Sequence, residues 1–158
     1  MIASPDFLEG ETNMTDAVKT PLHLWVVGGL SLIWNAFGAL DYTMTKMGNA
    51  EYLAAFTPEQ QAWFASFPMW ANIGWALGVW GSLLGSVLLL ARSRHAVSAF
   101  LISLIGLAIS CIYQFGMHYA DLMRLFGSFP MIFTAVIWVI LIALYLYARA
   151  QVAKGVLR

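Results

Sequence analysis

Four long segments of the chain consist almost entirely of uncharged residues, most of them apolar. They cover residues 22–44, 69–91, 96–117 and 131–148, and Asp41 is the single Asp, Glu, Lys or Arg in any of them. A helix needs about 20 residues to cross the roughly 30 Å hydrocarbon core of a bilayer. Each segment is close to that length, so the sequence predicts four transmembrane helices.

The composition of the whole chain agrees with this interpretation. Hydrophobic residues make up 61% of the sequence and charged residues only 10%, which is too few for a water-soluble surface. We therefore expect an all-α integral membrane protein, with a four-helix transmembrane domain over residues 21–150. Residues 1–20 are interpreted as a mobile acidic tail, and residues 151–158 as a basic tail.

Lys and Arg are distributed unevenly between the two ends of the predicted bundle. With an even number of spans, one end holds both termini and the loop between the second and third spans, with Lys19, Arg92, Arg94, Arg149, Lys154 and Arg158. The other end holds Lys46 and Arg124. Because cytoplasmic loops are enriched in Lys and Arg, both termini are expected to be cytoplasmic. The acids that then face outward are Asp41, Glu51, Glu59 and Asp121.

The tetrapeptide Ser-Phe-Pro-Met occurs twice, at residues 66–69 and 128–131, each time before a predicted span. Ser66 and Ser128 can cap free helical N–H groups, and proline is accepted in a first helical turn. Two tandem helical hairpins, related by an axis along the membrane normal, would explain the repeat. The alternative is that Ser and Pro recur wherever a helix begins at a membrane interface.

The segment between the first two spans carries signals for two short helices. Asn49 and Thr57 are favourable caps, Pro58 suits a first turn, and Thr57 with Gln60 has capping-box spacing. We expect amphipathic helices on the outer surface, with aromatic side chains in the headgroup layer: Tyr52, Phe56, Trp63 and Phe64. These helices are either a surface cover or a lid over an outer cavity.

Small residues form one helical stripe along the second predicted span: Gly74, Gly78, Gly81 and Gly85. In lipid, helices associate through close packing rather than through the hydrophobic effect, and small residues allow backbones to approach. The stripe therefore predicts a close helix crossing, either within one chain or between two chains.

Polar residues share one face of the first span and one face of the third. The first span has Ser31, Asn35, Gly38 and Tyr42; the third has Ser103, Gly106, Ser110 and Gln114, and His118 continues that line. Amides in lipid need hydrogen-bonding partners, so those of Asn35, Asn72 and Gln114 should point into the bundle. They either bond between helices or line a polar pocket that opens outward.

The pocket interpretation gives a set of candidate ligand-binding residues. Aromatic faces combined with amides or carboxylates suit a neutral polar solute such as a sugar, because its ring faces stack while its hydroxyls need directional hydrogen bonds. The candidates are Trp34, Asn35, Asp41, Tyr42, Trp70, Asn72, Trp75, Gln114 and His118. For Asp41 the simpler expectation is an ion pair with Lys46 or Arg124.

No motif in the sequence indicates catalysis. A nucleophile elbow, a zincin motif and a phosphate-binding glycine loop are all absent, and His118-x-x-Asp121-x-x-Arg124 is too sparse for a metal site. Cys111 has no second thiol and is interpreted as a packing residue. The basic residues form no stripe that could follow phosphates. We expect a protein that is not an enzyme and has no cofactor, metal or nucleic-acid partner.

Several short motifs resemble those of a group of small bacterial inner-membrane proteins that carry a general "sugar transporter" label. They are Trp34-Asn35, Asp41-Tyr-Thr-Met-Thr45, Phe56-Thr-Pro-Glu-Gln60, Phe67-Pro68, Gly78-Val-Trp-Gly81 and Arg92-Ser-Arg94. The resemblance covers most of residues 21–115. It implies a bacterial four-span protein of the inner membrane and raises the prospect of transport, but it supplies no binding residues.

Two functions fit the sequence. The first is a small transporter-like protein that binds a neutral polar solute. This function predicts a homo-oligomer, because four thin helices can hardly enclose a solute path alone. The second is a scaffold that does not transport: an accessory subunit of a larger membrane complex, or a lipid-binding or assembly factor. Both place the protein in the lipid bilayer.

Overall fold

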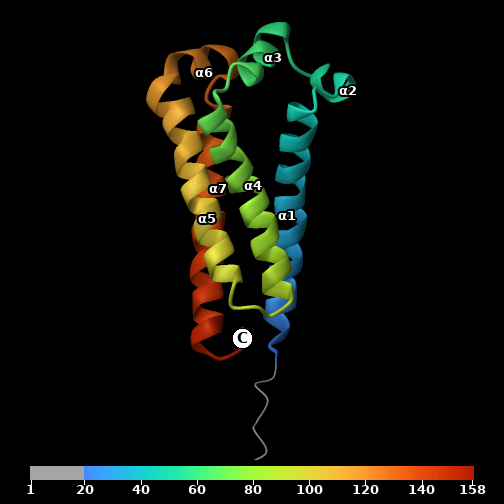
Figure 1. Ribbon diagram of the computed structural model, residues 1–158, viewed down its shortest axis with the longest axis vertical. Helices are drawn as coiled ribbons and strands as arrows, with labels where there is room; N and C mark the ends of the chain where they lie inside the picture. Colours follow the sequence, from blue (N-terminus) through green and yellow to red (C-terminus); the bar gives the residue numbers. More distant parts are fainter. Residues whose placement is uncertain (1–19) are drawn as a thin grey trace, which may run out of the picture.

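The computed structural model describes residues 20–158 as a bundle of long helices, and this part of the chain contains no strand (Figure 1). The predicted acidic tail, apart from Thr20, lies outside the described residues. Four helical segments are long and apolar enough to cross a membrane: α1 (Leu22–Lys46), α4 (Met69–Leu90), Ala96–Met117 and α7 (Phe129–Ala153). They confirm the predicted all-α four-helix bundle.

The third of these segments has two parts. α5 (Ala96–Cys111) is an ordinary α-helix, and η1 (Ile112–Met117) continues it as a π-helix. π-Helices are rare, and their hydrogen bonds join residues five apart rather than four. The side chains that follow are therefore turned away from the α-helical register. No feature of the sequence pattern distinguished this segment from α5.

Short helices connect the long ones at one end of the bundle. α2 (Ala50–Leu53) and α3 (Pro58–Ala65) confirm the two helices expected between the first spans. The Asn49 side chain accepts the Tyr52 N–H, and Thr57 forms a capping box with Gln60. A further helix, α6 (Tyr119–Phe126), precedes α7 and was not expected. We call this end the cap end, and the opposite end, with the α4–α5 loop, the terminal end.

The serines of the repeated tetrapeptide do not cap the helices that follow them. Ser66 donates to the Trp63 carbonyl at the end of α3, and Pro68 occupies the N-cap position of α4. Ser128 precedes α7 but makes no capping hydrogen bond with its side chain, although Pro130 does lie in the first turn. The capping prediction is therefore wrong, while the proposed duplication stays a prediction.

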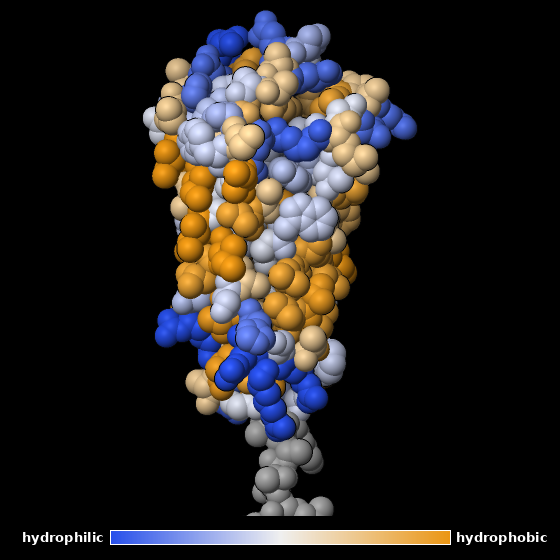
Figure 2. Space-filling model, viewed as in Figure 1, coloured by the Kyte–Doolittle hydropathy of each residue, from blue (hydrophilic) through white to orange (hydrophobic). Residues whose placement is uncertain are grey.

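The sides of the bundle are apolar, and the polar side chains of the spans lie inside. Leu30 and Phe37 of α1 are 65% and 67% exposed, whereas Ser31 and Asn35 of the same helix are buried. Figure 2 shows the result as a hydrophobic band between two hydrophilic ends. This arrangement is the inverse of that in a soluble protein. A bilayer requires it, because lipid tails cannot hydrogen-bond to an amide or hydroxyl that faces them.

The closest helix contact is between α4 and α5, within one chain. A Cβ atom added to Gly106 of α5 would lie 2.5 Å from the Gly78 nitrogen and 2.6 Å from the Gly74 oxygen. Gly81 is similarly close to the backbone of Ser103, and Gly85 to the ring of Phe100. The glycine stripe thus forms the predicted crossing. The contact with Gly106 shows that α5 contributes a small residue of its own.

The remaining helices pack around this pair. α1 lies against α4, and α7 lies against α5. α1 and α7 meet through side chains. The Trp34 and Phe133 rings are 6.0 Å apart, His23 Nδ1 is 2.6 Å from the Tyr147 hydroxyl, and Leu24 shares a hydrophobic cluster with α7 at one end. The bundle is therefore tight along α4 and α5 and wider between α1 and α7.

The terminal end is filled by a hydrophobic core that includes the end of the chain. Leu24, Leu89 and Phe100 are fully buried there, and Val156 and Leu157 pack into the same cluster. Residues 151–158, which were predicted as a basic tail, do not form a separate tail. α7 extends to Ala153, and the chain then folds back onto the core. Backbone hydrogen bonds of 2.9 Å join Arg158 to both Arg92 and Arg94, which fixes the α4–α5 loop to the end of α7.

Replacing Gly106 with alanine tests the α4–α5 crossing. The new methyl group would meet backbone atoms that cannot move aside, so the helices must separate. We expect Gly106→Ala to lower the free energy of unfolding by about 1–3 kcal/mol. The measurement is unfolding in mild detergent.

Gly29→Ala is the matched control, because a Cβ atom at this helical glycine of α1 meets nothing within 4 Å. It should be neutral or stabilising by up to about 1 kcal/mol, since alanine favours the helix. Equal stability of the two variants would contradict the packing described for α4 and α5.

Candidate functional site

A cavity of about 600 Å³ lies inside the bundle. All four spans contribute side chains to its lining, and α3 and α6 contribute at the cap end. A cavity of this size is large enough for a small organic ligand. Towards the terminal end it is bounded by Ile140 and Leu141, and Leu141 belongs to the hydrophobic core described above.

Most of the lining is aromatic or aliphatic. α7 contributes Phe129, Phe133, Ile137, Ile140 and Leu141. Fewer lining side chains are polar. α7 contributes Thr134, and the other three spans contribute Asn35, Asp41, Ser82, Ser103, Ser110 and Gln114. The cavity is thus an apolar space with a few polar groups contributed by all four spans, the usual character of a ligand site.

Asn35 of α1 is one of these polar lining residues. Its Nδ2 donates to the Ser82 carbonyl at 3.2 Å and to the Ser86 hydroxyl at 2.9 Å, so it joins α1 to α4. The side chain is only 8% exposed. Its Oδ1 accepts no hydrogen bond from residues 20–158. Asn35 therefore combines the two roles considered from the sequence: it bonds between helices and leaves an acceptor in the wall of the cavity.

Gln114 belongs to η1, near the cap end of the cavity. Its Nε2 donates to the Ser110 hydroxyl at 2.8 Å, one turn earlier. Ser103 lies deeper on the same face and donates to the Gly78 carbonyl across the α4–α5 crossing. Ser110 and Gln114 thus form a local pair that lines the cavity, whereas Ser103 also stabilises the helix contact.

Five of the predicted ligand-binding residues line the cavity. They are Trp34, Asn35, Asp41, Trp75 and Gln114. The other four predicted residues do not line it: Tyr42, Trp70, Asn72 and His118. Tyr42 lies behind the lining, with its ring edge-on to Trp75 at 5.1 Å. Trp70 is exposed on the side of the bundle, where its ring contacts that of Tyr113 at 5.7 Å.

Asn72 and His118 are held by backbone carbonyls near the cap end. Asn72 Nδ2 donates to the Phe67 carbonyl at 2.8 Å, so this amide bonds within its own connection rather than between spans. His118 Nδ1 lies 3.2 Å from the Tyr113 carbonyl, five residues earlier. The π-helix explains the position of His118, because it interrupts the i, i+4 line on which His118 was expected to follow Gln114.

Within residues 20–158, Asp41 forms no ion pair with a basic side chain, so the expected pair with Lys46 or Arg124 is wrong. It accepts a short hydrogen bond from the Tyr52 hydroxyl of α2. Burial of the phenol, this hydrogen bond and the negative charge of Asp41 together raise the pKa of Tyr52 to about 12. Lys46 instead donates to the Phe64 carbonyl and lies near the Phe67 and Trp75 rings. α2 is therefore tied to α1 beside the cavity.

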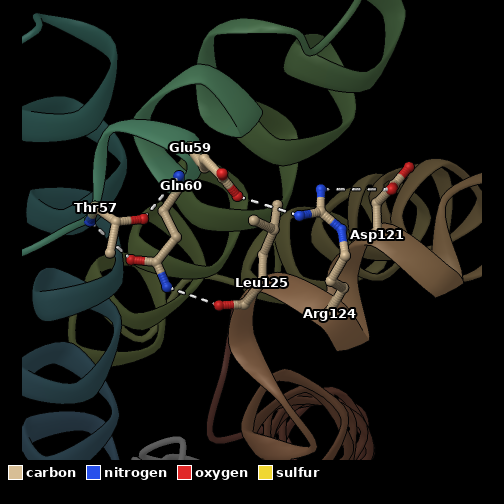
Figure 3. A network of polar contacts seen from close by, with 6 residues as sticks. All are labelled: Thr57, Glu59, Gln60, Asp121, Arg124 and Leu125. Atoms are coloured by element: carbon tan, nitrogen blue, oxygen red, sulfur yellow. Dashed lines mark hydrogen bonds and ion pairs between the residues drawn. The ribbon is translucent and has the colours of Figure 1, made fainter.

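Polar contacts between α3 and α6 close the cap end (Figure 3). Gln60 Nε2 donates to the Leu125 carbonyl at 2.8 Å, while its Oε1 accepts the Thr57 N–H at 3.0 Å. Arg124 reaches Glu59 at 3.1 Å and Asp121 at 3.8 Å. Because all three charged side chains are largely exposed, we expect the ion pairs to contribute little to stability.

The aromatic residues of the cap face the protein rather than the headgroup layer, which corrects the prediction for three of them. Trp63 is 7% exposed and packs in an aromatic cluster with Phe67 and Tyr113. Phe56 and Phe64 line the cavity. α3 and α6 therefore cover the cavity and provide part of its wall. Of the surface cover and the lid considered from the sequence, this arrangement resembles the lid.

The α7 lining was missed from the sequence. Residues 131–148 are so uniformly apolar that no stripe separates the cavity face from the lipid face. The one available signal was Thr134, the only side chain between residues 131 and 144 that can form a conventional oxygen or nitrogen hydrogen bond apart from the indole of Trp138. Ser82 of α4, next to Gly81 of the glycine stripe, lines the cavity but was likewise not among the predicted ligand-binding residues.

In comparisons with known proteins, no family model matches this chain, and no curated protein or solved structure matches it. The function must therefore be argued from the geometry of the cavity and its surroundings.

Replacing Gln60 tests the closure between α3 and α6. Gln60→Ala removes a cap of α3 and its bond to Leu125, so both helices should open more often. We expect amide hydrogen exchange in α3 and α6 to rise by about tenfold. Glu59→Gln should change it less than about threefold, because it removes only an exposed ion pair. The reverse order of effects would contradict this account of the cap.

The Tyr52–Asp41 contact predicts a pH dependence. The neutral phenol is the donor, so the stabilisation is complete below the ordinary tyrosine pKa of about 10 and is lost as the pH rises through about 12. The ultraviolet absorbance of tyrosinate, compared with Tyr52→Phe, isolates this residue. Asp41→Asn should lower the pKa of Tyr52 while leaving it above the ordinary value, because burial remains. An unchanged pKa in Asp41→Asn would disprove the coupling.

Proposed function

We propose that the protein binds a lipophilic molecule with a small polar group, taken up from the bilayer. The observation that carries this proposal is the mainly apolar cavity between α1 and α7, on the side where the bundle is wider. The proposal develops the lipid-binding alternative considered from the sequence.

The lining favours an apolar ligand over a sugar. Each sugar hydroxyl that leaves water without a partner costs free energy, so sugar sites surround their ligands with many donors and acceptors. Here polar side chains are few, and several already bond to each other or to the backbone. Apolar surface placed against Phe133, Ile137 and Ile140 needs no such partners.

The entrance that fits this ligand is lateral. Four aromatic residues of α1 and α7 both line the cavity and are exposed at 36% or more: Trp34, Phe37, Phe129 and Phe133. In a membrane, such side chains meet the hydrocarbon tails. A ligand dissolved in the bilayer can therefore reach the cavity without crossing water, whereas α3 and α6 cover the cap end.

The polar group of the ligand would be recognised by the polar residues of the lining, with Asn35 foremost. Asn35 Oδ1 provides a hydrogen-bond acceptor that residues 20–158 leave unused. The matching ligand group is a hydroxyl or N–H donor, and the rest of the ligand extends along α7. No charge on the ligand is required by this arrangement.

A neutral polar solute remains the second candidate, favoured by the presence of both indoles and amides in the lining: Trp34, Trp75, Asn35 and Gln114. Transport would also require the terminal core to open, because Leu141 and its neighbours fill that end. Uptake of a neutral sugar into liposomes tests this candidate directly. Flux that is the same in Asn35→Leu would remove this amide from the mechanism.

We further propose that the protein lies in a bacterial inner membrane with both termini in the cytoplasm. The terminal end carries Arg92, Arg94, Arg149, Lys154 and Arg158, and the cap end carries Lys46 and Arg124. This asymmetry follows the positive-inside rule. The resemblance to bacterial proteins supports the choice of membrane.

The binding proposal is tested with a long-chain fatty alcohol that carries a photoreactive diazirine. Purified protein in phosphatidylcholine nanodiscs is labelled, and the modified residues are mapped by mass spectrometry. We expect saturable labelling of the cavity side of α7. Asn35→Leu should weaken it by about tenfold, because one hydrogen bond to the ligand is lost. Asn72→Leu is the control, since this amide lies outside the cavity.

A second pair of variants separates loss of binding from loss of folding. Gly38 lines the cavity, and a Cβ atom there has ordinary space, so Gly38→Leu fills the cavity while keeping the amides. Gly29→Leu adds the same side chain where a Cβ atom meets nothing within 4 Å. Saturable labelling that survives unchanged in Gly38→Leu would refute the assignment of the ligand to this cavity.

A further inference from the structure

A second hollow lies at the terminal end, separate from the cavity. It has a volume of about 400 Å³ and lies between the start of α5 and the last turns of α7. Its polar lining consists of Arg94, His95, Ser98 and Arg149, and Val97 and Val152 add apolar surface. We call these residues the basic groove. None of them lines the larger cavity.

The two guanidinium groups of the basic groove have no acidic partner in the described part of the chain. Neither Arg94 nor Arg149 forms an ion pair or a side-chain hydrogen bond with residues 20–158. Arg149 lies over the Tyr145 ring at 5.7 Å, which leaves its N–H donors free for another group. All acidic side chains between residues 20 and 158 belong to the cap-end half of the molecule: Asp41, Glu51, Glu59 and Asp121.

The backbone holds the groove in a fixed shape. Arg94 donates its N–H to the Arg158 carbonyl, and Arg158 donates to the Arg92 carbonyl, both at 2.9 Å. The neighbouring Val156 and Leu157 are anchored in the terminal core. The loop that carries Arg94 is therefore fastened to the end of the helix that carries Arg149. A site prepared in this way loses less conformational entropy when it binds.

We infer that the basic groove binds the phosphate group of an anionic phospholipid. Arginine side chains match phosphate oxygens through paired N–H donors, and the N-terminus of α5 adds a favourable dipole. Arg149 directly follows the apolar part of α7, so the groove lies at the depth of lipid headgroups. Val97 and Val152 offer apolar surface beside the charges. Basic hollows between spans on the cytoplasmic side bind such headgroups in other membrane proteins.

The test compares phosphatidylglycerol with phosphatidylcholine added to the purified protein in mild detergent. Lipid binding is measured by native mass spectrometry, and thermal unfolding gives an independent readout. We expect phosphatidylglycerol to remain bound and to raise the unfolding temperature more than phosphatidylcholine does. Arg94→Gln/Arg149→Gln should weaken its binding by about thirtyfold, since each basic group near an anionic headgroup contributes about fivefold.

Lys154→Gln/Arg158→Gln is the matched control, because it removes the same charge from the same end but outside the groove. It should weaken binding by less than about threefold. An equal loss in both double variants would overturn the inference, because it would indicate diffuse attraction rather than a site. Inorganic phosphate provides a further arm: stabilisation by millimolar phosphate equal to that by the lipid would overturn the assignment to a phospholipid.

Discussion

Lipid hydrocarbon offers no hydrogen bond to an amide, a hydroxyl or a backbone carbonyl, and most of this structure follows from that constraint. It explains why Asn35 bonds to Ser82 and Ser86 inside the bundle while Leu30 and Phe37 of the same helix face outward. It also explains why serine hydroxyls of the spans return to backbone carbonyls, as Ser103 does to Gly78. Polar groups are thus gathered along the interior faces, where the cavity also lies.

The close contact of α4 and α5 has a second effect on the shape of the molecule. Glycines on both helices allow their backbones to approach closely, so little space remains between α4 and α5. α1 and α7 are instead bridged by large rings such as those of Trp34 and Phe133. Small residues thus bring α4 and α5 close together, and large residues hold α1 and α7 further apart. The cavity occupies the space that this difference leaves.

The parts of this structure that the sequence revealed are those set by local rules or by the solvent. Length and hydropathy identified the spans, and the caps at Asn49 and Thr57 identified α2 and α3. Asn35 and Gln114 were placed correctly because an amide in lipid must face inward. α6 and the extension of α7 beyond Ala148 were not found, although a glycine with positive φ follows each helix: Gly127 after α6 and Gly155 after α7. The fourth span was ended at the charge of Arg149, whereas the helix itself continues to Ala153.

The rest of the site depends on tertiary contacts. His118 leaves the expected line because η1 changes the helical register, and no residue pattern announces a π-helix. Trp63 and Phe64 are aromatic residues of the kind found at membrane interfaces. Only the packing of α3 on α6 shows that they face inward. The lateral entrance that we propose between α1 and α7 would have a thermodynamic consequence as well. For a molecule that enters there, occupancy depends on its mole fraction among the surrounding lipids rather than on its aqueous concentration, so partitioning into the membrane does part of the work of capture.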